Sequence, residues 1–229
     1  MNKLTQLLLL GLGLATCTTA RVCASQESVA QESTSQSSTS TSAPITQGSK
    51  PPKPSDDSRL VFQDISGAQH SVPCDPNTKC TVLVFINTQC PIANAYHPTL
   101  RKLKAEFADA KLADAKFEWV MIHADPETTT DAARKHQLEY DITWPIALDP
   151  GNKIARRVSA KVTPEAIIID ARGRVQYRGR IDDLHQDYGR KRPAPTTHDL
   201  KDALTSILND RPITQPETKA IGCIIRYAD

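Results

Sequence analysis

Two spacings of apolar residues run through the chain, and they predict a series of strands and helices. Residues 81–87 and 117–123 are mostly apolar, which is typical of strands buried in the middle of a sheet. Between them, from Pro91 to about Ala113, apolar residues recur at intervals of three and four, which predicts one long helix with a single buried face. The residues on that face are Ile92, Tyr96, Leu100, Leu103 and Phe107.

Shorter patterns before and after these segments predict the rest of the fold. An entry hairpin within residues 59–72 turns at Ser66 and Gly67, and threonines suited to helix capping open a helix at 128–139. The other predicted elements are an extended piece at 144–148, a short helix at 152–158, a hairpin of strands 163–170 and 175–179, and a last helix at 197–209. This order predicts an α/β fold with a central mixed sheet covered by helices on both faces.

The N-terminus has the pattern of an export signal. Lys3 is followed by an apolar run at 7–15, which is too short to cross a bilayer as a stable helix. Small residues allow cleavage after Ala20 or after Ala24, and polar residues follow the second site. We therefore expect a signal peptide at 1–24 and export to the periplasm or the extracellular space.

The remaining sequence divides into a linker, a domain and a tail. Residues 25–58 are rich in Ser, Thr, Gln and Pro and have little apolar surface, which predicts a disordered linker. Residues 59–212 are expected to form one domain, and 213–229 a C-terminal tail. Residues 14–17 also resemble a bacterial lipobox, so the alternative to simple export is a lipoprotein anchored at its N-terminus.

Charge and aromatic content argue against a nucleic-acid partner. The formal net charge is +2, with 24% charged residues of both signs, so no concentrated basic face is indicated. The basic run 190–192 is more simply interpreted as a solvated loop. Aromatic residues make up 5% of the chain, which is too sparse to suggest a base-stacking surface. Any membrane contact is expected through the N-terminus alone.

Cysteine usage agrees with an oxidising compartment. Cleavage after Ala24 removes two of the six cysteines, and those that remain are Cys74, Cys80, Cys90 and Cys223. Three pairings are open, and the sequence alone does not choose among them. Cys74 and Cys80 flank a short, turn-rich loop that a structural disulfide could close, and this pairing would leave Cys90 with Cys223.

Cys90 stands where the predicted strand 81–87 gives way to the helix that begins at Pro91. A thiol at that junction meets the unpaired N–H groups and the positive dipole end of the helix, which favour the thiolate. A lone cysteine in an arbitrary chain more often fills space as an inert buried thiol. Here the junction, the proline and a downstream Thr-Pro segment favour a reactive sulfur.

Residues 82–91 and 162–173, together with the order of elements, resemble a thioredoxin-fold redoxin, the group that includes thiol-disulfide oxidoreductases and peroxiredoxins. The resemblance covers about residues 59–209 and implies a three-layer sandwich. In that family a proline before the hairpin strand is cis and lies against the active cysteine, and Pro164 after Thr163 matches it. The resemblance thus implies that Thr163 and Pro164 present a backbone edge to a substrate strand beside an accessible sulfur.

The chain departs from each of the family's well-known active loops. Thioredoxins carry a second cysteine where this chain has Ala93, so Cys-x-x-Cys exchange is excluded. Peroxiredoxins have Thr or Ser at the position of Asn87 and Pro at the position of Leu83. This chain therefore lacks the hydroxyl that helps to polarise a peroxide there. Copper-delivering relatives need a second cysteine at Asn94, so copper binding by two thiolates is not expected at this loop.

These patterns predict a thiol-dependent oxidoreductase with Cys90 as its nucleophile. We expect Cys90 to attack a disulfide or a peroxide, and Cys223 or an external thiol to resolve the adduct. Gly222, which allows unusual backbone angles, would help the tail fold back; equally, Cys223 is merely packed in a groove beside its isoleucine neighbours. The expected partners are a disulfide or peroxide substrate and an external thiol reductant, with no cofactor.

Two other classes of function compete with this interpretation. One is a non-catalytic binding module that uses the same fold to hold a peptide or partner, and a weaker one is a metal-handling protein. His97 is expected to be a partly exposed, satisfied histidine, and the acidic stretch 180–187 with His185 a solvated loop, because their spacing fits no tight ligand pattern. Arg178 or Arg180 could support a thiolate. We expect no metal site.

Overall fold

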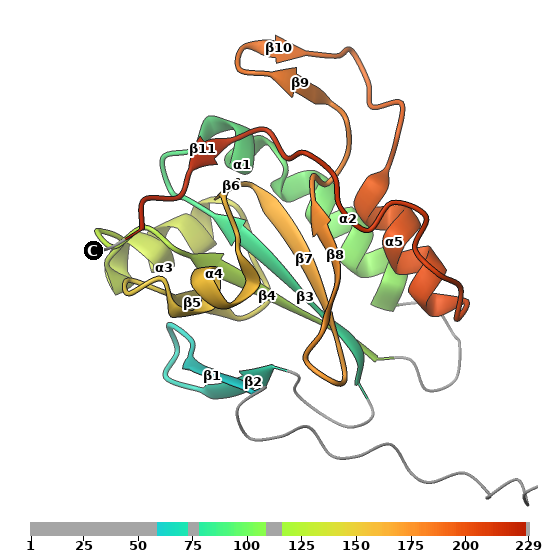
Figure 1. The fold of residues 1–229 in the computed structure, drawn as a ribbon. Coiled ribbons are helices and arrows are strands. Elements are labelled where there is room, and N and C mark those ends of the chain that lie inside the picture. The colour runs from blue at the N-terminus through green and yellow to red at the C-terminus, as the bar shows by residue number, and fades with distance from the viewer. Residues whose placement is uncertain (1–58, 73–77, 109–115, 228–229) are drawn as a thin grey trace, which may run out of the picture. The chain divides into compact units, whose positions relative to one another are not determined.

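The computed structural model describes residues 59–72, 78–108 and 116–227, and the predicted signal and linker lie outside these ranges. A five-stranded mixed sheet forms the centre (Figure 1). Its strands, in spatial order, are β5 (Ile146–Leu148), β4 (Lys116–His123), β3 (Thr78–Ile86), β7 (Glu165–Asp170) and β8 (Val175–Gly179). β3, β4 and β5 are parallel, whereas β7 runs antiparallel to both β3 and β8.

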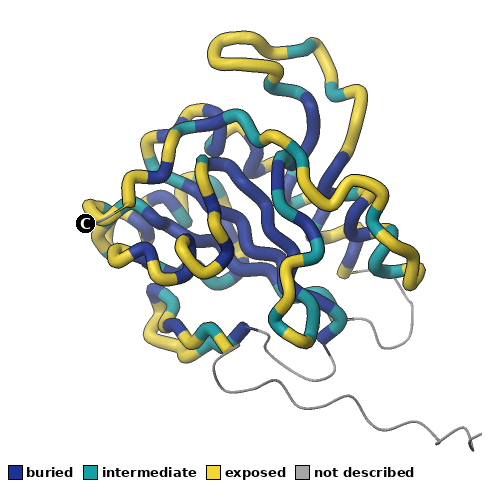
Figure 2. Tube along the Cα trace, viewed as in Figure 1, coloured by how far each residue is buried: buried dark blue, intermediate teal, exposed yellow. Residues whose placement is uncertain are grey.

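Alternating residues of the central strand face two separate cores. On β3, Val82 and Val84 belong to one apolar cluster, and Leu83 and Phe85 belong to the other. The first cluster includes side chains of α1 (Pro91–Ala95), α2 (His97–Ala108), α3 (Thr130–Glu139) and α5 (Asp199–Leu208). The second includes α4 (Lys153–Val158) and the hairpin β1 (Leu60–Gln63) and β2 (Gln69–Val72). Buried segments accordingly concentrate in the sheet (Figure 2). The predicted α/β fold with a covered mixed sheet is confirmed.

The helix predicted from Pro91 to Ala113 is wrong as one continuous element. The structure has α1 and α2, which are separated at Tyr96, and the segment 109–115 lies outside the described residues. Pro98 explains the break, because it has no N–H to donate to the preceding turn. All five residues of the predicted apolar stripe are nevertheless buried in the first core.

Several short strands were absent from the predicted elements. β9 (His185–Asp187) and β10 (Arg190–Lys191) form a hairpin that projects from the domain (Figure 1). The basic run therefore begins in an exposed strand instead of a simple loop. β6 (Val162–Thr163) precedes β7, and it pairs with β11 (Cys223–Ile224) from the far end of the chain. Within the described residues, no helix has the length and apolarity needed to span a membrane.

The C-terminal strap, which we define as residues 213–227, folds back along the domain (Figure 1). It first runs beside β8, where the Arg178 N–H donates to Pro216 O and the Thr218 N–H donates to Arg178 O, both at 2.9 Å. Gly179 makes this approach feasible, since a Cβ there would lie 2.5 Å from Thr218 O and its φ of +151° is strained for other residues. The strap then crosses to β6.

Candidate active site

Cys90 caps the N-terminus of α1 with its own side chain. Its backbone is extended, with φ −84° and ψ 107°, and Pro91 occupies the first helical turn. The sulfur accepts a hydrogen bond from the Ala93 N–H at 3.4 Å. The thiol therefore lies at the strand-to-helix junction that the sequence indicated, and one of the unpaired N–H groups of the helix points at it.

Thr163 lies directly against this sulfur. The Cys90 thiol donates to Thr163 O at 3.0 Å, and the Thr163–Pro164 peptide bond is cis. The sheet explains the proximity: β3 leads towards Cys90, and its residue Phe85 is the antiparallel partner of Glu165, the first residue of β7. The two residues expected to bind substrate thus lie beside the thiol.

The strap brings Cys223 to the same place. β11 pairs antiparallel with β6, and Cys223 is the register partner of Thr163. Thr163 therefore links the two cysteines, because its carbonyl accepts the Cys90 thiol and its backbone is paired with Cys223. The strap thus brings a cysteine from the C-terminal segment beside Cys90, and the two thiols shift each other's pKa.

Gly222 has a role different from the one its sequence context suggested. We expected it to supply unusual backbone angles, but its φ lies outside the left-handed region. Glycine is needed here because there is no room for a side chain. A Cβ at this position would lie 2.0 Å from Thr163 O and 2.5 Å from the Thr163 carbonyl carbon. Because rigid backbone occupies this space, β11 can pair with β6 in this register only with glycine before the cysteine.

The two thiols have opposite acidities. Burial opposes ionisation of Cys90, but hydrogen bonds from the Cys223 thiol and from the N–H groups of Ala93 and Cys223 outweigh it, so the pKa of Cys90 is lowered. Burial, together with the hydrogen bond to Cys90 and the charge on that sulfur, raises the pKa of Cys223 to about 11. The pair therefore consists of a nucleophilic sulfur and a proton-bearing partner.

The expectation that the Cys90 sulfur would be accessible is wrong for this state of the protein. Cys90 is 1% exposed, whereas Cys223 is partly exposed. Atoms of α1 and β6 hydrogen-bond to the Cys90 sulfur, and the strap pairs with β6 beside it. The strap thus contributes to the cover, and it belongs to the chain itself.

The two arginines considered as supports for the thiolate have other partners. Arg178 donates to Val158 O at 2.8 Å and 3.1 Å. Arg180 forms an ion pair with Asp199 at 2.9 Å. The acidity of Cys90 is therefore assigned to hydrogen bonds without a neighbouring guanidinium.

Cys80 lies on β3, away from the N-terminus of α1, is 1% exposed and is not bonded to Cys90 or Cys223. Burial strongly raises the pKa of this thiol, so it is poorly suited to nucleophilic chemistry. Cys74 lies outside the described residues, so its proposed structural disulfide with Cys80 stays a prediction.

A cluster of three buried histidines lies behind the active loop, and the sequence did not reveal it. The ring of His136 packs edge-on against His97 and His123, with centroids 5.1 Å and 5.2 Å apart. His136 Nε2 bonds Asn94 Oδ1 at 2.9 Å, and the Asn94 amide donates to Thr88 O at 3.0 Å. The cluster is thereby tied to both sides of the Cys90 loop.

His97 was expected to be partly exposed and satisfied, and this is wrong. It is 1% exposed, and within the described part of the chain neither of its ring nitrogens has a hydrogen-bond partner. Burial lowers the pKa of His97 to about 4 and that of His123 to about 3, with further lowering by the neighbouring histidines. No sequence motif indicates this cluster, because the three histidines belong to three different elements.

No group of three or more His, Cys, Asp or Glu side chains suited to hold a metal ion occurs among residues 59–72, 78–108 and 116–227. His185, in the acidic stretch considered earlier, lies on β9 and packs against Tyr96 with a ring-centroid distance of 5.5 Å.

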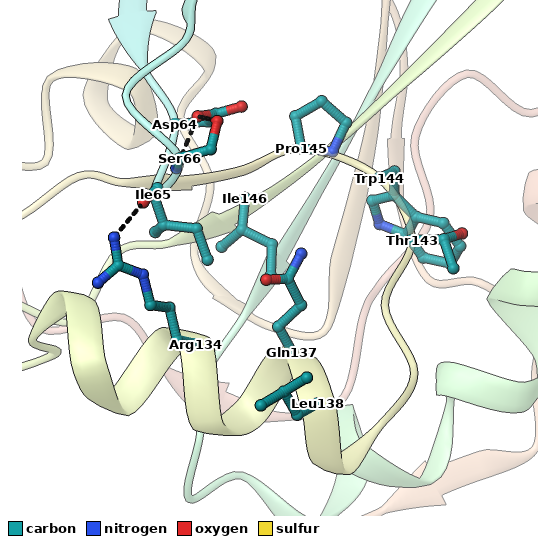
Figure 3. A pocket seen from close by; sticks show the side chains of 10 residues that line it. All are labelled: Asp64, Ile65, Ser66, Arg134, Gln137, Leu138, Thr143, Trp144, Pro145 and Ile146. Carbon is teal, nitrogen blue, oxygen red and sulfur yellow. Dashed lines mark hydrogen bonds between the residues drawn. The ribbon is translucent and has the colours of Figure 1, made fainter.

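A separate open groove of about 470 Å³ lies between the β1–β2 turn, α3 and the segment before β5 (Figure 3). Arg134 crosses it to donate to Ile65 O at 3.0 Å. Its lining residues are Asp64, Ile65, Ser66, Arg134, Gln137, Leu138, Thr143, Trp144, Pro145 and Ile146. Neither cysteine of the thiol pair lines this groove, so it belongs to a different part of the surface.

Comparisons with known proteins agree with this architecture. A scan against protein-family models matches Redoxin over residues 65–191, more than half of the chain. A search of the curated proteins finds no significant match.

Solved structures with related folds come from several bacteria. A protein from Sinorhizobium meliloti 1021 has 22% identity and a TM-score of 0.62, over 74% of this chain and 91% of that one. A protein from Geobacillus kaustophilus has 22% identity and a TM-score of 0.61, over 74% and 89%. The C-terminal domain of a protein described as a thiol-disulfide oxidoreductase, from Bacteroides thetaiotaomicron, has 13% identity and a TM-score of 0.50, over 66% and 93%. The fold is the predicted thioredoxin-like sandwich.

Proposed function

The chain belongs to the redoxin family, and from this premise we propose that it is a thiol-disulfide oxidoreductase that cycles between a Cys90/Cys223 dithiol and a Cys90–Cys223 disulfide. The observation that carries the proposal is the pairing of β11 with β6, which places Cys223 opposite Thr163, the residue whose carbonyl accepts the Cys90 thiol. The two thiols shift each other's pKa in opposite directions, lowering that of Cys90 and raising that of Cys223. A merely packed Cys223 would not need to meet the most acidic thiol of the site.

In the first step, the Cys90 thiolate attacks one sulfur of a substrate disulfide. A new bond forms between Cys90 and that sulfur, the substrate S–S bond breaks, and the second substrate sulfur leaves as a thiolate. The N–H of Ala93 supports the attacking charge before the step. The departing thiolate is a base, and it takes up the proton that Cys223 must lose.

In the second step, Cys223 attacks the Cys90 sulfur of the mixed disulfide. Two of the three causes that raise the pKa of Cys223 are its hydrogen bond to Cys90 and the charge there. Both disappear once Cys90 is bonded to substrate, so Cys223 becomes more acidic when it is needed. The remaining substrate sulfur leaves as a thiolate, which takes a proton from solvent, and the protein holds a disulfide. Two external thiol equivalents restore the dithiol and are themselves oxidised to a disulfide.

The site supports a disulfide substrate better than a peroxide. Asn87 and Leu83 replace the hydroxyl and the proline of the peroxide-activating loop. Both arginines near the hairpin are engaged with Val158 and Asp199, so no guanidinium is available from them to polarise a peroxide oxygen. Insulin-disulfide reduction is expected to exceed peroxide consumption under the same reductant supply.

The test of the proposed pair is the disulfide itself. After the reduced protein is incubated with oxidised glutathione and its remaining thiols are blocked, non-reducing peptide mass spectrometry is expected to find Cys90 joined to Cys223. Cys80 should be recovered without a bond to either of them. An oxidised protein in which Cys223 is still a free thiol would refute the proposed cycle.

A non-catalytic binding module is the competing class. It would use the β6 edge to hold a partner and would not require an acidic thiol. Peptide-resolved alkylation of Cys90 against pH separates the two, because an apparent pKa at the unperturbed value of about 8.5 would favour the binding module.

We also propose that the protein is exported. The basic and apolar N-terminal segment and the polar stretch after Ala24 support this. The mature protein from an export-competent bacterial host is expected to begin at Ser25, which N-terminal sequencing and intact mass would show. Lipid-modified Cys17 at the N-terminus would instead establish a lipoprotein, and an uncleaved Met1 in the cytoplasmic fraction would contradict export.

A further inference from the structure

We propose that the β6 edge is a binding site for an extended peptide in which glycine directly precedes the reacting cysteine, and that the strap is its internal occupant. This inference rests on the proposed function and names its substrate class as a polypeptide disulfide. The strap then shows, within the chain itself, how such a peptide lies against the site.

The strap binds β6 in the manner of an added strand. Cys223 is the register partner of Thr163 and Ile224 that of Val162, and the Ile225 N–H donates to Lys161 O at 2.9 Å. Successive side chains of the strap alternate: Ile224 is 76% exposed, whereas Ile225 is 6% exposed and packs in the second core. Backbone pairing with pockets for alternate side chains is how a sheet edge receives a peptide.

The residue before the cysteine is the most restricted position of this arrangement. At Gly222, a Cβ would lie 2.0 Å from Thr163 O and 3.0 Å from Pro164 N, and both atoms are backbone that a side-chain rotation cannot move. The same Thr163 carbonyl accepts the Cys90 thiol. A substrate strand that takes the place of β11 in this register must therefore carry glycine there, followed by cysteine, any residue and an apolar residue.

The contacts that hold the end of the strap are suited to release. Arg226 meets Asp125 and Glu127 at 3.3 Å, but its side chain is 66% exposed, and exposed ion pairs contribute little. The hydroxyls of Tyr188 and Tyr227 bond the backbone carbonyls of Gly222 and Ala160. The deepest anchor is the Ile225 side chain, so a peptide with a matching apolar residue can replace it.

In the proposed reaction, the substrate strand and the strap occupy β6 in turn. When the strap opens, the substrate strand pairs with β6 and presents its cysteine sulfur to the Cys90 thiolate. The Cys90–substrate bond forms as the substrate S–S bond breaks and its other sulfur leaves as a thiolate. The strap then returns with Cys223, whose proton passes to the first leaving thiolate. The Cys223–Cys90 bond forms as the Cys90–substrate bond breaks, and the substrate cysteine leaves as a thiolate that solvent protonates. Both strands carry their cysteine to the same position opposite Thr163.

The first experiment measures how fast iodoacetamide modifies Cys90 in full-length reduced protein, by peptide-resolved mass spectrometry. Gly222→Ala is expected to raise this rate by roughly tenfold or more, because the strap no longer seats. Gly151→Ala is the matched control, since a Cβ at Gly151 meets nothing within 4 Å, and it should alkylate like the wild type.

A second variant protects this experiment against a folding artefact. Ile225→Asp destabilises the bound strap by placing a carboxylate at its buried position, and it leaves Gly222 unchanged. Circular dichroism verifies that each variant retains the folded domain. Both variants are expected to expose Cys90. If folded Gly222→Ala and Ile225→Asp proteins alkylate no faster than the wild type, the strap does not cover the sulfur and the inference is wrong.

The second experiment tests the sequence preference of the edge. In the full-length Gly222→Ala/Cys223→Ser protein, Cys90 is the only thiol of the site. It receives a synthetic peptide of residues 218–227 whose cysteine is activated as a 2-thiopyridyl disulfide, and release of the thiopyridone is followed. The native peptide is expected to react roughly tenfold or more faster than one with alanine in place of glycine. Equal rates would overturn the preference.

The outcomes separate the inference from the proposed function. If the wild-type protein never forms the Cys90–Cys223 disulfide, the redox cycle fails, and the alkylation and peptide results still decide whether β6 binds a Gly-Cys strand. If the disulfide forms and the two peptides react alike, the cycle stands and the proposed substrate class is wrong.

Discussion

Replacing Cys223 by serine is expected to leave the first thiol exchange intact and to stop the cycle at the mixed disulfide. A serine hydroxyl can still donate a hydrogen bond to the Cys90 sulfur, so the lowered pKa of Cys90 is largely retained. Serine cannot form the second S–S bond. With limiting external thiol, turnover of a disulfide substrate should fall by on the order of 10²-fold or more, while a stoichiometric Cys90 adduct accumulates.

Two further variants serve as controls for this result. Cys90→Ser should form no adduct and show no turnover, because the attacking sulfur is gone. Cys80→Ala should cycle like the wild type, since that thiol is buried on β3 and its pKa is raised. Adduct mass and turnover are measured in parallel by intact-protein mass spectrometry and insulin reduction. A Cys223→Ser protein with wild-type turnover and no adduct would remove Cys223 from the mechanism.

Acid is expected to destabilise the protein strongly through the buried histidine cluster. The pKa of His97 is lowered by burial, by His136 and by Arg101 from 6.5 to about 4, and that of His123 to about 3. Below pH 6.5 the unfolded chain binds protons that the folded chain excludes, so the free energy of unfolding decreases as the pH falls. This loss continues until the pH reaches the folded pKa values, near 4 and 3.

The size of this effect is large for a single domain. A shift from 6.5 to about 4 corresponds to about 3 kcal/mol for His97 alone, against a typical total of about 5–15 kcal/mol. Urea unfolding at several pH values between 7 and 4 measures the slope. His97→Leu removes the titrating ring, and its slope should be shallower than that of the wild type whatever its absolute stability.

Two features of this experiment assign the pH dependence to the histidine cluster. Asp149 and Glu165 have pKa values raised by burial and act in the opposite direction, so the difference in slope between variant and wild type is the quantity of interest. His198 is exposed at the start of α5, and His198→Gln should retain the wild-type slope. A His97→Leu protein with an unchanged slope would show that the buried ring does not control the acid response.

The layered core could be predicted from the sequence because it depends on local periodicity. The alternation on β3 and the stripe from Ile92 to Phe107 both became buried surfaces, as their spacings indicated. The helix break at Pro98 was missed because the apolar spacing continues across it, although the lost N–H was visible in the sequence. The β9–β10 hairpin was missed because its residues are polar and mostly exposed, so burial imposes no pattern on them.

The site was predictable only in part. Cys90 could be placed because a strand and a helix start are local features, and Pro164 because it precedes a recognisable hairpin strand. The accessibility of the sulfur was wrong, since the cover comes from a distant segment. The histidine cluster was missed for the same reason: one ring comes from β4 and the others from α2 and α3.

The amino-acid order by itself determined which elements form and which thiol stands at a helix start, because hydrogen bonding and side-chain periodicity act over neighbouring residues. Only the tertiary structure decided that Cys223 meets Cys90 and that Gly222 lies against the Thr163 carbonyl. Those contacts depend on how β8 and β6 guide the strap across the domain, and residues far apart in the chain are brought together only by packing of the whole.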